Sequence, residues 1–300
     1  MFDLGLRRVR KTRTRGTGRR LPLLEGLEDR RLLNGSLDTS FSGDGKQTVA
    51  FNFGGNRDDV ANAVAVQRDG KIVVAGYAEQ GSGDYDFAVA RLNPDGTLDD
   101  SFGDHGVRTI AFDKGGDDDD RASGVAIDGK GRIVVVGFAE RGSGDYDFAV
   151  ARLKPDGSLD DDFYGGDGMR TIAFNEGGND YDIARAVAID GSNRIVIVGY
   201  AQIDSLDYDF AVARLDADGY LDGSFYGGDG LRTIGFDLGG DGFDVGNAVA
   251  IQSDGKIVIA GYAERDTGYD FAVARLKSDG FLDDTFGGDG RINIDFNLGS

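Results

Sequence analysis

Aspartate residues recur in this chain at spacings that could build a cation site. One set, spaced by 61, 62 and 62 residues, consists of Asp59, Asp120, Asp182 and Asp244. A second set, in which a tyrosine follows each acid, consists of Asp84, Asp145 and Asp207. Calcium binds about six to eight oxygen ligands, many of them carboxylates, so loops of this kind predict a calcium site. The alternative is that each short side chain accepts hydrogen bonds from backbone amides of its own turn.

One further loop approximates a short calcium-binding sequence. Its acids are Asp216, Asp218 and Asp222, although the full ligand spacing of an EF-hand is absent. Where Asp216 stands, the corresponding turns have Asn93, Lys154 and Lys277. Those substitutions favour a structural role for the turn. No cofactor is indicated firmly, and calcium is the one candidate.

Repeated arginines and a single histidine are the other reactive side chains. The arginines are Arg91, Arg152, Arg214 and Arg275. They could bind an anion, but charge-assisted hydrogen bonds to a nearby acid such as Asp86 or Asp99 explain four equivalent copies better. His105 stands where other copies have aspartate, and no nucleophile motif accompanies it. Paired carboxylates can hydrolyse glycosides, yet among 53 acids pairing alone identifies no site, so we expect no catalytic residues.

A tyrosine precedes each of the four copies of a seven-residue sequence that begins with aspartate. These tyrosines are Tyr85, Tyr146, Tyr208 and Tyr269. Such rings could stack on sugars in a lectin-like site, or they could pack within the fold. The sequence leaves both interpretations open.

These residues are positioned by a repeat. The heptad Asp-Phe-Ala-Val-Ala-Arg-Leu occurs at Asp86 to Leu92, Asp147 to Leu153, Asp209 to Leu215 and Asp270 to Leu276. Its phenylalanines are spaced by 61, 62 and 61 residues, so the chain is a repeat protein. Apolar residues occupy both faces of the heptad, which predicts a strand in a sheet that is covered on both sides. We find no helical pattern in the repeat, so neighbouring sheets must provide the cover.

Each repeat contains four strand patterns. Two of them form a hairpin around an Asp-Gly turn such as Asp69-Gly70, the heptad follows, and an outer strand ends the unit. The outer strand occurs five times, first at Gln47 to Phe51 and last at Arg291 to Phe296, which predicts 17 strands. The pattern predicts an all-β β-propeller of four-stranded antiparallel blades, with about four repeats. It leaves open a closed four-bladed ring with a spare strand, an open arc and a β-solenoid.

Charge divides the chain into two segments. Residues 1–35 hold ten basic and four acidic residues, and the remainder holds 23 basic and 49 acidic residues, a balance of −26. We expect residues 1–34 to form a basic, disordered targeting segment and residues 35–300 to form the propeller domain. Its acidity disfavours nucleic acid as a partner. No run of 18 apolar residues predicts a transmembrane helix. The chain has no cysteine, which is compatible with both an exported and a cytoplasmic location. The sequence does not indicate an oligomeric state.

Two resemblances to known families can be stated. Residues 35–300, including Asp69 to Gly76 and Asn93 to Phe102, resemble the bacterial delta-60 repeat, which implies a propeller-like fold and no catalytic residues. Leu24 to Leu33 is similar to the Leu-Glu-Pro-Arg motif with a Leu-Leu pair found in exported planctomycete proteins, although Asp29 replaces the proline. This implies export, with a cytoplasmic location as the alternative. We expect a non-enzymatic exported or cell-surface scaffold for protein or glycan partners, and the competing hypothesis is a glycan-acting hydrolase or lyase.

Overall fold

A computed structural model describes residues 36–296, apart from 52–56, 82, 113–118, 143, 175–180, 205, 237, 239–241 and 267. The predicted targeting segment 1–34 and its export-like motif therefore lie outside the described residues. Residues Asp38–Ser300 form one compact unit.

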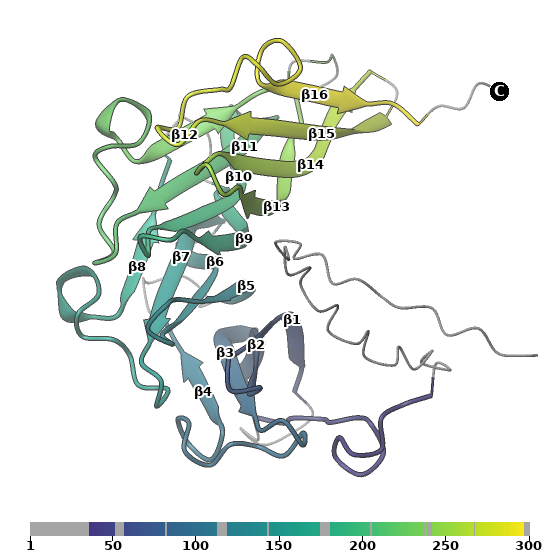
Figure 1. The fold of residues 1–300 in the computed structure, drawn as a ribbon, viewed down its shortest axis with the longest axis vertical. Coiled ribbons are helices and arrows are strands. Elements are labelled where there is room, and N and C mark those ends of the chain that lie inside the picture. The colour runs from purple at the N-terminus through teal and green to yellow at the C-terminus, as the bar shows by residue number, and fades with distance from the viewer. Residues whose placement is uncertain are drawn as a thin grey trace, which may run out of the picture. The chain divides into compact units, whose positions relative to one another are not determined.

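The described residues contain sixteen strands in four antiparallel sheets (Figure 1). The first sheet comprises β1 (Asp59–Val66), β2 (Ile72–Gly81), β3 (Asp84–Leu92) and β4 (Val107–Ile110). The second comprises β5 (Arg121–Ile127), β6 (Ile133–Gly142), β7 (Asp145–Leu153) and β8 (Met169–Ile172). The third comprises β9 (Ile183–Ile189), β10 (Ile195–Asp204), β11 (Asp207–Leu215) and β12 (Leu231–Ile234). The fourth comprises β13 (Val245–Ile251), β14 (Ile257–Arg265), β15 (Gly268–Leu276) and β16 (Arg291–Ile294).

Each sheet is a meander in which strands follow one another in chain order. The repeated heptad forms most of the third strand of every sheet, as predicted. Its register with the outer strand is the same each time: Phe87 lies opposite Ile110, and Phe271 lies opposite Ile294. Two short 3-10 helices, Tyr164–Gly166 and Tyr226–Gly228, lie between the third and outer strands of the second and third sheets. The prediction of an all-β, propeller-like fold of four-stranded blades is confirmed.

The core lies between consecutive sheets. Phe87 and Val89 of β3 are fully buried against the second sheet, whereas Ala149, Ala151 and Leu153 of β7 face back toward the first. The same arrangement recurs between the second and third sheets and between the third and fourth. Alternate side chains of a strand point to opposite faces, so a heptad with apolar residues on both faces supplies both cores. No helix among the described residues is long and apolar enough to cross a membrane.

The outer segments at the two ends depart from the prediction. Gln47 to Phe51 is not a strand, so the described residues contain sixteen strands rather than 17. The fourth heptad pairs with β16 and not with this segment. The four sheets do not close into a ring. The open ends leave Val64 of the first sheet 65% exposed and Phe271 of the fourth sheet 58% exposed. An open array, one of the three alternatives, is what the chain forms.

Candidate functional site

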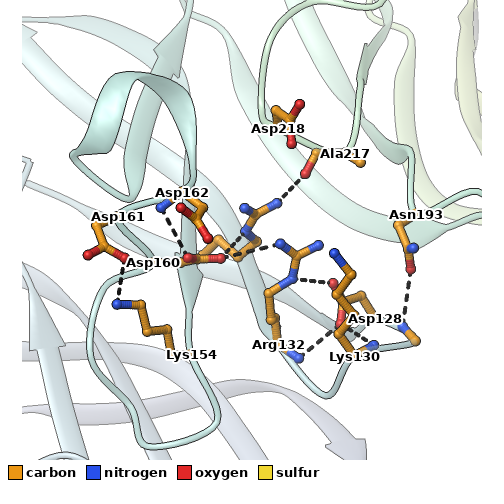
Figure 2. Close-up of polar contacts among 12 residues, drawn as sticks. Asp128, Lys130, Arg132, Lys154, Asp160, Asp161, Asp162, Asn193, Ala217 and Asp218 are labelled. Carbon is orange, nitrogen blue, oxygen red and sulfur yellow. Dashed lines mark hydrogen bonds and ion pairs between the residues drawn. The ribbon is translucent and has the colours of Figure 1, made fainter.

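The arginine of each heptad forms an ion pair with an aspartate eight residues later. We call these the Arg–Asp pairs: Arg91–Asp99, Arg152–Asp160, Arg214–Asp222 and Arg275–Asp283. In the second sheet, Arg152 Nε donates to Asp160 Oδ2 at 2.7 Å, and only 1% of the arginine side chain is exposed. Figure 2 shows Asp160 receiving dashed contacts from more than one basic group, of which Arg132 lies at 3.4 Å. The prediction that these arginines pair with nearby acids is confirmed.

The first three Arg–Asp pairs also link neighbouring sheets. Arg152 donates at 2.5 Å to the carbonyl oxygen of Ala217, in the turn after β11, and Arg214 donates to that of Ser278, in the turn after β15. The guanidinium of Arg152 lies 4.5 Å from the ring centre of Phe163, a cation–π contact. The arginine therefore joins its own strand, the following turn and the next sheet. Its Nε and Nη1 donors are used within the fold, whereas the buried Nη2 has no hydrogen-bond partner.

These contacts lower the pKa of three of the paired aspartates, Asp99, Asp222 and Asp283. Burial of Asp99 opposes its ionisation, but hydrogen bonds from Lys71, Ser101 and Arg91 outweigh burial and hold its pKa well below the usual value. Asp283 has a lowered pKa for the same reason, with the Thr285 hydroxyl as the largest cause. A carboxylate held in this state is a poor general acid or base near neutral pH, because catalysis favours a pKa close to the working pH.

The first set of predicted calcium ligands accepts hydrogen bonds from the backbone. Asp120, Asp182 and Asp244 are buried, and each accepts the amide hydrogen of a phenylalanine eight residues earlier at 2.7 Å. Asp59 accepts the same bond from Phe51 at 3.1 Å. The described residues contain no group of three or more acidic, histidine or cysteine side chains arranged to hold a metal. Calcium binding stays a prediction.

The loop of the second calcium prediction is closed by its own acids. Asp216 Oδ1 accepts from the amides of Asp218 and Tyr220, at 3.0 and 2.9 Å. Asp222 pairs with Arg214 at 2.8 Å. The structure thus places Asp216 and Asp222 in two separate hydrogen-bond networks. His105 has a side chain that is 88% exposed, at φ +50° in its loop.

At the opposite end of the heptads, aromatic side chains form what we call the aromatic belt. It consists of Tyr77, Tyr85, Phe138, Tyr146, Tyr181, Tyr200, Tyr208, Phe243, Tyr262 and Tyr269. Two of these rings in each sheet, from the second and third strands, meet edge to face; Phe138 and Tyr146 are 5.3 Å apart at an interplanar angle of 89°. Every belt residue is partly or largely exposed. Tyr269 is the most exposed, at 60%.

Side chains from the start of the following sheet continue the belt across each boundary. Tyr181 contacts Tyr146 at 5.1 Å, and Phe243 contacts Tyr208 at 4.8 Å. At the first boundary a cation takes this role, because the guanidinium of Arg121 lies 4.4 Å from the Tyr85 ring. The belt is therefore a run of ring edges and faces that extends over all four sheets.

The chemical environment of the belt combines apolar rings with charged groups. Burial raises the pKa of Tyr146, and the nearby Glu140 carboxylate raises it further. Burial also raises the pKa of Tyr208. Both tyrosines are neutral hydrogen-bond donors at physiological pH. The guanidinium groups of Arg121 and Arg185 lie over two other rings of the belt, those of Tyr85 and Tyr200.

Sequence reasoning identified one ring of the belt in each sheet. The four tyrosines before the heptads were expected either to stack on sugars or to pack, and the structure places them in ring contacts with part of each ring still exposed. Tyr181 and Phe243 were missed because they follow loops without a repeated pattern. A further signal was the aromatic residue that recurs at the same position within each second strand, as Tyr77, Phe138, Tyr200 and Tyr262.

Comparison with known families supports the repeat architecture. Four segments, 67–102, 131–163, 191–225 and 252–286, match a family model described as a domain of unknown function (DUF5122) beta-propeller. Together the segments cover less than half of the chain. Their match supports a propeller-like repeat protein. No curated protein sequence matched the chain.

Solved structures with similar folds have very different sequences. An exo-1,5-alpha-L-arabinanase from a bovine ruminal metagenomic library is 13% identical, over 77% of this chain and 76% of that one, with a TM-score of 0.39. A GH32 beta-fructofuranosidase of Bombyx mori is 9% identical over 80% and 49%, with a TM-score of 0.40, so this chain spans about half of that enzyme. A fucose lectin from Kordia zhangzhouensis is 11% identical over 57% and 96%, with a TM-score of 0.32. At these values none of the likenesses carries an argument about function.

Proposed function

We propose that this protein is a non-enzymatic binding module that holds a glycan against the aromatic belt. The observation that carries the proposal is the continuity of partly exposed rings over four sheets, with Tyr181 and Phe243 bridging two boundaries. Fully buried rings would serve packing alone. Rings that pack by their edges and keep a part in solvent provide both rigidity and a contact surface.

The chemistry of the belt suits a carbohydrate. Aromatic rings present an electron-rich face, which attracts the positively polarised C–H groups on one side of a sugar ring. Tyrosine hydroxyls and the guanidinium groups of Arg121 and Arg185 supply donors for sugar oxygens. A site that repeats from sheet to sheet fits a polymer better than a single small molecule.

The location and family form part of the same proposal. The export-like motif at Leu24 to Leu33 supports a role outside the cytoplasm, where an extended glycan is accessible. Secretion of the full chain from its bacterial host, detected in the medium or on intact cells by antibody, tests this. Retention inside the cell, with Arg30 and Arg31 both intact, contradicts it.

The binding proposal is tested by titrating the full chain with a panel of neutral and acidic oligosaccharides in a calorimeter. Binding should weaken about tenfold, or ~1.4 kcal/mol, in Tyr146→Ala and again in Tyr208→Ala. Tyr220→Ala is the matched control, because Tyr220 is an aromatic residue 50% exposed at the other end of β11. Equal losses in all three variants, or no binding by any oligosaccharide, would overturn the proposal.

The same samples distinguish the hydrolase or lyase alternative and test calcium. Chromatography of each oligosaccharide after incubation should recover it intact, and release of shorter products would establish an enzyme instead. Thermal unfolding with calcium and with a chelator tests the predicted metal. A midpoint that rises with calcium and falls in Asp216→Asn assigns it to that loop, and an unchanged midpoint contradicts the prediction.

A further inference from the structure

The two end faces of the array are the two halves of an interface that the chain already forms three times. The outer face of the fourth sheet presents Val258, Ala260, Phe271, Val273, Ile294 and Phe296. Their counterparts in the first three sheets are buried by the next sheet; Phe87, Phe148 and Phe210 are each 0% exposed. Phe271 is 58% exposed and Phe296 is 62% exposed.

The first sheet exposes the complementary half. Val64 and Val66 of β1 are 65% and 68% exposed. Their counterparts in the second sheet, Val125 and Ile127, pack into the core that Phe87 and Val73 build from the sheet before. What the first sheet lacks is therefore a preceding sheet, and the residues that would cover it are of the kind that the fourth sheet exposes.

Residues 38–51 already occupy part of this interface. Phe41 packs on Gly96, so closely that a Cβ atom there would lie 2.9 Å from the ring, and Phe102 packs on Gly157 in the same way. The Ser42 amide donates to the Asp95 carbonyl at 2.7 Å, as Gly103 does to Asp156 at 2.8 Å. The segment thus contacts the first sheet as the outer segment of a preceding sheet would.

Two outer segments each lack one of the two interactions that an internal outer strand makes, which are pairing with a heptad and contact with the next sheet. The internal outer strands β4, β8 and β12 both pair with a heptad and pack on the next sheet. Gln47 to Phe51 bonds to the first sheet through the Phe51 amide and Asp59 but is not part of a sheet. In contrast, β16 pairs with β15 but leaves Ile294 41% exposed. If the fourth sheet of one copy covered the first sheet of another, a single outer segment could both pair with β15 and contact the first sheet.

We propose that a second copy of this chain covers the first sheet with its fourth, head to tail. In this assembly Gln47 to Phe51 of one copy pairs with β15 of the other and replaces β16. A second copy keeps the three internal interfaces, except that the bond from Arg291 of β16 to the carbonyl of Gly235, which follows β12, is lost. Closure of one chain on itself would require all three to change, because with them formed both end faces stay exposed.

Side-chain hydrogen bonds indicate which of the two outer segments, residues 38–51 or β16, remains in the assembly. The Gly96 carbonyl accepts a hydrogen bond from the Ser42 hydroxyl at 3.0 Å, and the equivalent carbonyl of Gly219 accepts one from Arg170 at 2.9 Å. In the last segment the corresponding residues are Gly287 and Ile292, which carry no side-chain donor. Only residues 38–51 satisfy that carbonyl, so they stay and β16 leaves.

The exchanged segment also reproduces the last Arg–Asp pair. Asp38 Oδ1 accepts from the Ser40 amide and hydroxyl at 3.0 and 2.6 Å, as Asp283 accepts from Thr285 at 3.2 and 2.7 Å. Asp38 of one copy therefore has the same turn geometry as Asp283 and could pair in its place with Arg275 of the other copy. The incoming segment restores the strand pairing that β16 gives up, and the two apolar end faces become buried as well.

Complementary variants test the head-to-tail contact by sedimentation of the full chain. The wild type should sediment as at least two copies of 31.9 kDa, and Val64→Asp and Phe271→Asp should each be monomeric. An equimolar mixture of the two should recover a dimer, because it pairs one intact first sheet with one intact fourth sheet. Leu206→Asp, a change at a residue 65% exposed in the turn between β10 and β11, is the control and should assemble normally.

A monomeric wild type, or a mixture that stays monomeric, overturns the proposal. So does self-association of either single variant, since that would indicate a contact between two like faces.

Cysteine pairs test the strand exchange, because the chain contains no cysteine of its own. Ala272 lies opposite Asn293 in β16, and Thr48 is the counterpart of Thr109, which lies opposite Ala88. The double variant Thr48→Cys with Ala272→Cys should form a disulfide between chains, seen as a doubled mass without reductant. A disulfide within one chain would mean self-closure, and preferential closure of the control pair Ala272→Cys with Asn293→Cys in the oligomer would mean that β16 keeps its place. Melting of the reduced variants shows that each still folds.

Discussion

The two ends of the repeated heptad are surrounded by different kinds of side chain. Beyond its carboxyl end each sheet has an Arg–Asp pair, which is nearly dry in the second sheet, where 1% of Arg152 is exposed. Near its amino end each sheet has aromatic rings that remain partly exposed, such as Tyr146 and Tyr208. The charged groups look more reactive in the sequence, yet their hydrogen bonds are used within the fold. The rings, which look like packing residues, are the ones that reach solvent.

Removal of a buried Arg–Asp pair member should produce the largest effect. Arg152→Ala leaves Asp160 charged and largely buried, so the free energy of unfolding should fall by about 3–5 kcal/mol. The matched change Arg275→Ala, at a side chain 20% exposed, should lower it by only about 1 kcal/mol. Urea unfolding of both variants measures the difference. Equal losses would show that burial does not distinguish the two pairs.

Acid should weaken the paired end before the aromatic end. The folded-state pKa values of Asp99, Asp222 and Asp283 lie below the ordinary value of 3.8. Their contribution to stability is therefore complete above that value and is lost as the pH falls toward the folded-state pKa values. Melting temperatures measured from pH 7 to pH 2 should decline most steeply below pH 4.

Asp99→Asn serves as the control for this prediction. It cannot change its charge, so its melting temperature should start lower and should decline less steeply with acid. Parallel curves for the variant and the wild type would contradict the assignment of the acid sensitivity to this pair.

Loss of a belt ring should have the smallest effect on folding. Tyr208→Leu removes ring contacts with Tyr200 and Phe243, which should lower the free energy of unfolding by about 1 kcal/mol. Tyr269→Leu, at a residue 60% exposed, should change it by less than about 0.5 kcal/mol. Thermal unfolding compares the two. A loss for Tyr208→Leu as large as that for Arg152→Ala would mean that the belt is core rather than surface.

Much of the fold follows from local sequence patterns. The alternation of phenylalanine and valine with alanine in the heptad predicted a strand that is covered on both faces. In β7, Phe148 and Val150 belong to one apolar cluster, whereas Ala149 and Ala151 belong to another. The Arg–Asp pairs could be predicted because an arginine and an aspartate eight residues apart recur in every unit. Patterns of this kind are local, so a single chain segment contains them.

The environment of the acids could not be predicted in the same way. Asp120 is compatible with a metal loop by residue type, and only the structure places its carboxylate 2.7 Å from the Phe112 amide. Gln47 to Phe51 has the same pattern as the other outer strands, yet it lacks a neighbouring heptad and forms no ladder. A strand requires a partner strand, and a sequence pattern does not identify the partner.

The sequence by itself determined the number of repeats, the order of strands in each sheet and the two-sided apolar character of the heptad, because these depend on periodicity and on neighbours close in the chain. The tertiary structure alone decided that the array stays open, that the rings of successive sheets join into a belt, and that two apolar faces remain exposed. Those features depend on how whole sheets pack on one another. That packing is set by the summed interactions of residues about 60 positions apart, such as Phe102 on Gly157, which no local pattern contains.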